Sequence, residues 1–340
     1  MKQRIFIGLL LVTLIQGAHG QSYKLIKSVP IGGEGGWDCL SIDAQARKLY
    51  VTHATKIVVV DLTRDNVSGE IADTPGVHGF AIAPELGRGF SSNGTESSVS
   101  VVDLKTLKTI AKVESGENPD VILYDSAHSE VYVFNGRGNS ATVINAKSNN
   151  VVTTVPLPGK PEFAVIDQLG ERVFCNIEDK NEVAVFDMKT HAMTGTWPLA
   201  PGQEPSGIAF DAVHHRLFVT CNNKIMVMLD SDTGRVVAKT PIGARVDGCA
   251  FDDARQRAFA SCGEGTMTIA KEEALDKLTT VQTLTTELGA RTIALDPGTH
   301  RVYTCTAQIA PDTRPSPLPG ERRRPNYVPG TFHVLVYGTE

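Results

Sequence analysis

The sequence lacks three features that would place it quickly in a class of proteins. Beyond an apolar run over residues 5–15 it has no second long apolar stretch, so no membrane anchor is predicted. It has no excess of positive charge: the formal net charge is −5, which argues against nucleic acid or an anionic membrane as the main partner. It also lacks the HExxH, GxSxG, CxxCH and phosphate-loop signatures, so no motif independently supports an enzyme.

Cysteines are few, and their spacing fits neither a zinc site nor the framework of a small disulfide-rich domain. The sequence allows one disulfide, because the positions of Cys249 and Cys262 in their repeat would place them opposite each other on adjacent strands. The other four are expected to be buried small apolar residues: Cys39, Cys175, Cys221 and Cys305.

The first twenty residues have the pattern of a signal peptide. Lys2 and Arg4 precede the apolar run over residues 5–15, which is too short to span a bilayer comfortably, and the small residues of AHG follow it. We therefore predict a signal peptide over 1–20 and a mature domain over 21–340, located in the periplasm or secreted. No cysteine follows the predicted cleavage point, so no lipid anchor is expected. Loss of the two basic residues takes the formal charge from −5 to −7.

What the sequence does contain is a unit repeated seven times at intervals of 40 to 44 residues. Each unit has an apolar run, usually an aspartate, a short turn, and then a Tyr or Phe seven residues after the aspartate position, which opens a second run. Two further β-rich runs follow in most units, as in "IVVVDL" and "KTIAKVESG". These repeated positions, here called anchors, are Asp43, Ala83, Asp125, Asp167, Asp211, Asp252 and Asp296. Four short strands per period of this length predict an all-β propeller with seven blades.

The last repeat predicts how the ring closes. Only three strand-like runs precede the end of the sequence, whereas residues 23–33, "YKLIKSVPIGG", read like the fourth run of the other blades. Pairing this N-terminal strand with the last one would remove an exposed edge and make one domain. The alternative is an open β-solenoid of similar period, which would not need a detached strand at the start.

Polar side chains recur five residues before each anchor, at the start of each first strand. The first and second strands of a blade are antiparallel, so the first strand starts on the face of the ring where the second strand ends. These residues should therefore surround the mouth of the central channel. We call them the mouth ring: Asp38, His78, Asp120, Glu162, Ser206, Asp247 and Arg291. The ends of the second strands add further predicted binding residues: His53, Asn93, Asn135, Asn176, Glu178 and Asn222. For any single position the alternative is a strand end that is polar because it meets water.

The composition of the mouth ring predicts cation binding. Four carboxylates with one or two imidazoles suit a small cationic ligand or a divalent cation such as Ca²⁺, Mg²⁺, Mn²⁺ or Zn²⁺, with His78, Asp120 and Glu162 as candidate metal ligands. An alternative is a hydrolase or lyase with His78 or Glu162 as general base and Arg291 or a metal stabilising an oxyanion. A third interpretation is a scaffold that binds a protein partner and has no chemistry of its own.

A long connection in the seventh repeat should lie over this mouth. Residues 308–330 are rich in proline and arginine and carry no strand pattern, which is uncommon inside a compact domain. We predict a lid whose basic side chains, Arg314, Arg322, Arg323 and Arg324, face the acidic ring. The alternative is a solvated loop without a role.

Several repeats resemble a known family. The units "KLYVTHATKIVVVDLTRD", "RLFVTCNNKIMVMLDSDTG" and "SVSVVDLKTLKTIAKVESGENPDVILYD" are similar to the YVTN-type repeats of exported YncE-like β-propellers, and the similarity covers essentially the whole mature chain. The resemblance implies a seven-bladed propeller. It does not select a function, because related propellers include lactone hydrolases, lyases, parts of redox enzymes and binding modules.

Overall fold

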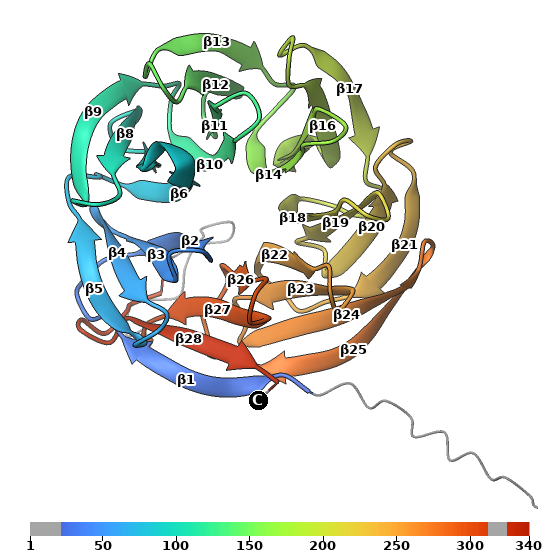
Figure 1. Cartoon of the computed structure of the whole chain (residues 1–340). Helices are drawn as coiled ribbons and strands as arrows, with labels where there is room; N and C mark the ends of the chain where they lie inside the picture. The colour runs from blue at the N-terminus through green and yellow to red at the C-terminus, as the bar shows by residue number, and fades with distance from the viewer. Residues whose placement is uncertain (1–21, 312–324, 340) are drawn as a thin grey trace, which may run out of the picture.

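A computed structural model describes residues 22–311 and 325–339. Seven four-stranded antiparallel sheets stand around a central axis like the blades of a propeller (Figure 1). The predicted all-β, seven-bladed fold is therefore confirmed. The predicted signal peptide over 1–20 lies outside the described residues, and within them no helix combines the length and hydropathy needed to cross a bilayer.

The first four blades use consecutive strands from the centre outward. Blade one contains β2 (Trp37–Asp43), β3 (Lys48–His53), β4 (Lys56–Asp61) and β5 (Asn66–Ile71). Blade two contains β6 (Val77–Ala83), β7 (Arg88–Asn93), β8 (Ser98–Asp103) and β9 (Lys108–Glu114). Blade three contains β10 (Pro119–Asp125), β11 (Glu130–Asn135), β12 (Ser140–Asn145) and β13 (Val151–Pro156). Blade four contains β14 (Pro161–Asp167), β15 (Arg172–Ile177), β16 (Glu182–Asp187) and β17 (Met193–Pro198).

The remaining blades follow the same plan, apart from the closing strand. Blade five contains β18 (Pro205–Asp211), β19 (Arg216–Cys221), β20 (Ile225–Asp230) and β21 (Val236–Pro241). Blade six contains β22 (Val246–Asp252), β23 (Arg257–Cys262), β24 (Thr266–Ala274) and β25 (Lys277–Thr285). Blade seven contains β26 (Ala294–Asp296), β27 (Arg301–Thr306), β28 (His333–Gly338) and β1 (Lys24–Pro30). Two short 3₁₀ turns, η1 (Pro84–Leu86) and η2 (Glu178–Lys180), lie in blades two and four.

The anchor aspartates are turn residues. The Asp43 carboxylate accepts the backbone N–H of Ala46 at 2.8 Å, and Asp211 accepts that of Val213 at 2.8 Å. Such a side chain replaces a backbone partner in a tight turn, so the chain can reverse from the first strand of the blade into the second. Blade two has Ala83 at this position and makes the reversal with η1 instead.

The aromatic residue that follows each anchor packs between blades. All seven are buried: Tyr50, Phe90, Tyr132, Phe174, Phe218, Phe259 and Tyr303. Phe218 of blade five stacks on Phe251 of blade six with ring centroids 4.6 Å apart, and Tyr50 of blade one lies 4.8 Å from Phe80 of blade two. Burial of such rings is a large apolar contribution, so the repeat that is visible in the sequence forms the contact between neighbouring sheets.

The N-terminal strand closes the ring as predicted. Strand β1 pairs antiparallel with β28, from Lys24 opposite Gly338 to Pro30 opposite His333. Tyr23, just before this strand, is buried against Phe259 of blade six with ring centroids 5.1 Å apart. Its hydroxyl donates a hydrogen bond to the carbonyl of His300 at 2.9 Å, so the closing segment contacts two blades.

The expectation that Cys249 and Cys262 lie opposite each other was wrong. Cys249 pairs with Ala260, whereas Cys262 pairs with Val246. The chain turns between Asp252 and Arg257, which pair with each other, and regular register from this tight turn places the partner of Cys249 two residues before Cys262. All six cysteines are free thiols.

Candidate functional site

The mouth ring lies where the innermost strands begin. In each of blades one to six the register between the first and second strands shifts at this point, for example between Trp37 and Leu40 and between Val77 and Phe80. Such a bulge bends the strand and redirects a side chain. The repeated irregularity therefore presents the second residue of each inner strand, such as Asp38 and His78, at the mouth of the channel.

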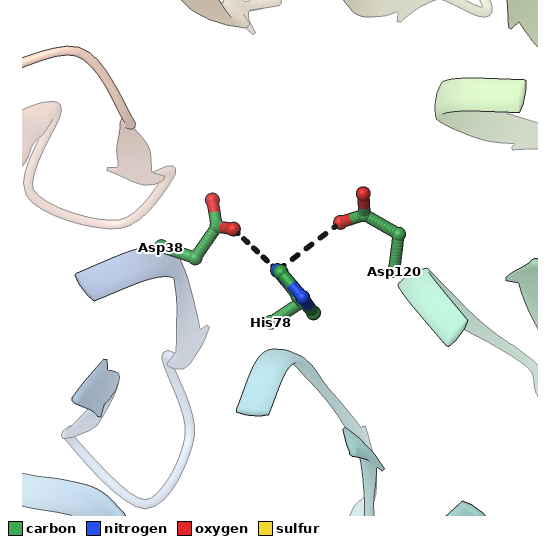
Figure 2. Close-up of side chains that lie close together, drawn as sticks. All are labelled: Asp38, His78 and Asp120. Atoms are coloured by element: carbon green, nitrogen blue, oxygen red, sulfur yellow. Dashed lines mark hydrogen bonds and ion pairs between the residues drawn. The ribbon is translucent and has the colours of Figure 1, made fainter. Parts of the chain in front are cut away.

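His78 is held between two carboxylates from neighbouring blades (Figure 2). Its Nδ1 lies 2.7 Å from Oδ2 of Asp38 in blade one and 3.7 Å from Oδ1 of Asp120 in blade three. One ligand atom from each residue lies within 4.8 Å of the other two. All three side chains are partly buried, so the cluster combines restricted motion with access from solvent.

Arg291 forms the second contact group in the ring. Its Nε donates to Oδ2 of Asp247 at 2.6 Å, and its terminal nitrogen lies 3.8 Å from Oδ1 of Asp38. The same guanidinium donates to the carbonyl of Trp37 at 3.1 Å. Ser206 donates to Oδ1 of Asp247 at 3.0 Å. These bonds fix Arg291 and connect blades five, six, seven and one.

Lys160 was not among the predicted site residues, although it lies at the ring. Its Nζ is 2.5 Å from Glu162 and forms a second ion pair with Glu178. The predicted residues Glu162 and Glu178 are thus brought together by a cation that the sequence analysis missed. Lys160 stands two residues before Glu162. Reading the sequence two residues upstream of each mouth-ring position would have found it.

Burial changes the charge of the ring at neutral pH. It raises the pKa of Asp120 to about 7, with a further contribution from the charge of Asp38, while His78 opposes the shift. Burial also raises the pKa of Glu162 to about 8 and that of Asp247 above its ordinary value. Each shift arises because a carboxylate loses solvation when it leaves water. The apo ring therefore binds protons near neutral pH and carries less negative charge than four ionised carboxylates would.

Replacing Glu162 with Gln is expected to stabilise the protein at pH 9 and to leave its stability near pH 4 unchanged. The folded-state pKa of about 8 lies above the ordinary 4.5, so stability is complete below pH 4.5 and is lost as pH rises through 8. Glutamine never ionises and avoids this loss, which is on the order of 5 kcal/mol at pH 9 for a pKa shift of this size. Urea unfolding at the two pH values measures it. A less stable variant at pH 9 would mean that the Lys160 ion pair outweighs the burial of Glu162.

A cavity of about 840 Å³ opens beside the ring. Its wall includes three ring residues, Asp38, His78 and Arg291, together with two further arginines, Arg137 and Arg245. These last two side chains are exposed, and among residues 22–311 and 325–339 neither forms an ion pair with a carboxylate. The cavity therefore has a basic rim, formed by Arg137 and Arg245, and Asp38 is the one carboxylate in its described wall. Arg245 stands two residues before Asp247, the same relation that Lys160 has to Glu162.

The other predicted binding residues do not join the cavity wall. His53 is 1% exposed and stacks on Phe332 with ring centroids 4.2 Å apart. Asn93 and Asn135 are buried and donate to serine or threonine hydroxyls of their own blades, for example from Asn135 to Thr142 at 3.0 Å. Asn176 donates to the carbonyl of Ser206 at 2.7 Å and so joins blades four and five, and Asn222 is partly buried next to them.

The two described ends of the connection over residues 308–330 pair with each other, and the second of them reaches the cavity. Ile309 and Tyr327 form a β-bridge, and Pro325 and Tyr327 line the cavity wall. Tyr327 packs on Trp37 with ring centroids 4.4 Å apart. The predicted lid residues Arg314, Arg322, Arg323 and Arg324 lie outside the described residues. The base of the connection thus borders the mouth, and the lid itself stays a prediction.

Comparison with known proteins identifies the fold. No protein-family model and no curated protein matches the sequence. Among solved structures, Kuenenia stuttgartiensis hydrazine synthase is similar with a TM-score of 0.71 and 16% identity over 86% of this chain and 95% of that chain. A chain of the mitotic checkpoint complex has a TM-score of 0.73 and 11% identity over 89% and 96%, and U3-55K has 0.72 and 8% over 92% and 98%. At these identities the likeness shows architecture alone: this chain is a seven-bladed β-propeller.

Proposed function

We propose that this propeller binds a divalent metal ion at the mouth of its channel, with Asp38, His78 and Asp120 as ligands. The observation that carries the proposal is the position of the His78 imidazole between two carboxylates of adjacent blades, at 2.7 and 3.7 Å (Figure 2). One nitrogen and two oxygen ligands suit Zn²⁺ or Mn²⁺ better than Ca²⁺, which prefers oxygen ligands alone. A bound ion would take the place of the proton on Nδ1 of His78.

The basic rim favours a metal ion over an organic cation. A bulky ammonium ligand would have to lie among Arg137, Arg245 and Arg291, which line the same cavity. A metal ion is small enough to lie between Asp38 and Asp120. Of the three arginines, Arg291 is paired with one of these ligands, at 3.8 Å from Oδ1 of Asp38. Arginines beside an ion also suit a small molecule with a carboxylate or similar anionic group, because guanidinium binds such groups in pairs of hydrogen bonds.

This proposal includes membership of the YVTN-repeat propellers and an exported location. Its support is the degenerate YVTN tetrad at Tyr50-Val51-Thr52-His53, the seven repeats, and the signal-peptide pattern over 1–20. Solvent reaches the proposed metal site. Such a site suits an exported binding protein, which takes its ligand from the medium outside the cytoplasm. Detection of the protein in the periplasm or medium, with residue 21 as its first, would test the location.

The metal site is tested by titrating Zn²⁺ and Mn²⁺ into chelator-treated protein by isothermal calorimetry. We expect the double variant His78→Gln with Asp120→Asn to lose one binding equivalent, with an affinity at that site at least about 100-fold lower. This estimate follows because even residues that only orient metal ligands contribute 10- to 100-fold. His128→Gln, on the opposite face, serves as the control and should bind as wild type does. If the double variant binds the same number of ions with the same affinity, the mouth ring holds no metal.

A further inference from the structure

A second cluster of metal-ligating side chains lies on the opposite face, between blades five and six. Asp211 ends β18, His214 stands in the turn that follows, and Glu272 belongs to β24 of the next blade. Nδ1 of His214 lies 2.7 Å from Oδ2 of Asp211 and 3.8 Å from Oε2 of Glu272. A ligand atom of each residue lies within 4.8 Å of the other two.

Glu272 occupies a position of the repeat that blades one to five fill with an apolar or small residue: Leu62, Leu104, Ala146, Met188 and Ser231. Strands β24 and β25 have nine residues each, whereas the corresponding strands β20 and β21 of blade five have six. Glu272 lies where this extension begins, and its backbone N–H donates to the carbonyl of Gln256 at 3.0 Å, as that of Ser231 does to His215 in blade five. Arg216 of blade five donates to the carbonyl of Leu275 at 2.8 Å and so holds the tip of the hairpin over Asp211.

The Glu272 carboxylate is buried without a hydrogen-bond donor. Its side chain is 2% exposed, and neither oxygen has a donor among the described residues. Asp211, which is 0% exposed, is itself an acceptor: it takes the backbone N–H groups of Val213 and His214 and the His214 ring nitrogen. A buried carboxylate without a partner is costly, so this pair needs a cation or a shared proton.

Among the described basic side chains, only the His214 ring contacts both carboxylates, at 2.7 and 3.8 Å. The Arg216 guanidinium donates its hydrogen bonds elsewhere: to the Asp230 carboxylate and to the carbonyls of His214, His215 and Leu275. Asp253 adds a further acid, and burial together with Asp211 raises its pKa. Burial and the neighbouring Asp211 raise the pKa of Glu272 to about 7, whereas the pKa of His214 is raised by its bond to Asp211. His214, at 39% side-chain exposure, is the member that solvent reaches.

Other blades show how the same position is normally satisfied. Asp125 accepts a hydrogen bond from Gln168 of the next blade at 3.0 Å. Asp252 contacts Nδ1 of His300 at 2.9 Å, and Asp296 pairs with Arg47. In blade six the residue equivalent to Gln168 is Asp253, so Asp211 faces acids where Asp125 faces an amide donor. The same turn is therefore closed by a donor in blade three and left with an excess of acceptors in blade five.

We propose that Asp211, His214 and Glu272 bind a divalent transition-metal ion that links blade five to blade six. One imidazole nitrogen and two carboxylate oxygens suit Zn²⁺ or Mn²⁺, and the exposed side of His214 leaves room for a water ligand. The ion neutralises two buried carboxylates and cross-links neighbouring sheets. Its role is structural, and it is independent of the site at the mouth.

The test uses full-length mature protein in which His78→Gln and Asp120→Asn silence the mouth. After chelator treatment, Zn²⁺ should still bind with one equivalent and should raise the melting temperature by roughly 3 °C or more. Adding Glu272→Gln should weaken this remaining site at least about tenfold and abolish the Zn²⁺-dependent rise. Adding His214→Gln, at a partly exposed position, should do the same and guards against a folding defect in the Glu272 variant.

His128→Gln is the matched control, because His128 and Asp125 form the same turn with Gln168 as donor. It should leave both Zn²⁺ binding and the Zn²⁺-dependent rise intact. Retention of the rise in the Glu272→Gln and His214→Gln proteins would overturn the proposal. So would a mouth-silenced protein that binds no Zn²⁺, since the two carboxyls would then share only a proton.

Discussion

Deletion of residues 23–33 is expected to destabilise the protein by roughly 5 kcal/mol, or to prevent it from folding. The deletion removes β1 and with it the hydrogen bonds along six register pairs with β28, each contributing roughly 1 kcal/mol. It also removes the buried side chains of Tyr23 and Val29, whose burial contributes about 1.5–3 kcal/mol each. The conformational entropy that the deleted residues no longer lose on folding offsets about half of this sum. The unpaired edge of β28 would favour association with other chains. Urea unfolding and size-exclusion chromatography of the truncated protein measure both effects.

Two substitutions within β1 separate its pairing from its packing. Val29 is buried, so Val29→Ser should lower stability, whereas Leu25 is exposed and Leu25→Ser should change it by less than about 0.5 kcal/mol. A truncated protein that unfolds at the wild-type denaturant concentration would show that β1 does not stabilise the closed ring.

The second large effect is expected from Gly207→Ala in the innermost strand of blade five. An added Cβ would lie 2.5 Å from the backbone nitrogen of Cys249 and 2.7 Å from the backbone carbon of Gly248, both in β22. Backbone atoms held in a sheet cannot move aside as a flexible side chain can. We therefore expect a loss of about 3 kcal/mol, at the upper end for overpacking, in the free energy of unfolding. Chemical denaturation should show an earlier midpoint with an unchanged slope.

Gly195→Ala in the outermost strand of blade four is the matched control. A Cβ there would meet nothing within 4 Å, so the same change should be neutral or slightly stabilising. Equal losses from the two variants would mean that the approach of blades five and six at the channel does not require glycine.

The fold could be predicted from the sequence because its main contacts repeat. Each anchor, such as Asp211, and each following aromatic, such as Phe218, has the same place in its blade, so the periodic pattern carries the three-dimensional information. The closing strand was predictable for the same reason, since residues 23–33 match a run that the seventh repeat lacks.

The candidate site could be predicted only as a ring of positions. The repeat places Asp38, His78 and Asp120 at equal depth, but it does not say that His78 turns toward both carboxylates. Asn135 shows the limit most clearly, because its amide turns back to Ser140 and Thr142 of its own sheet and away from the mouth. The far-face cluster was missed because only blade six has an acid at its repeat position: Glu272 stands where blades one to five have Leu62, Leu104, Ala146, Met188 and Ser231.

The pairing of β1 with β28 also sets an order in time. Strand β1 leaves the ribosome before the other strands of the ring, whereas its partner β28, His333–Gly338, is made after all of them. Six blades can assemble from neighbours in sequence while synthesis continues, whereas the contact across the junction spans nearly the whole chain and is slow to form. Until then the first strand has no partner within the ring. A factor that shelters this segment would therefore act on the growing chain and have no target on the finished propeller.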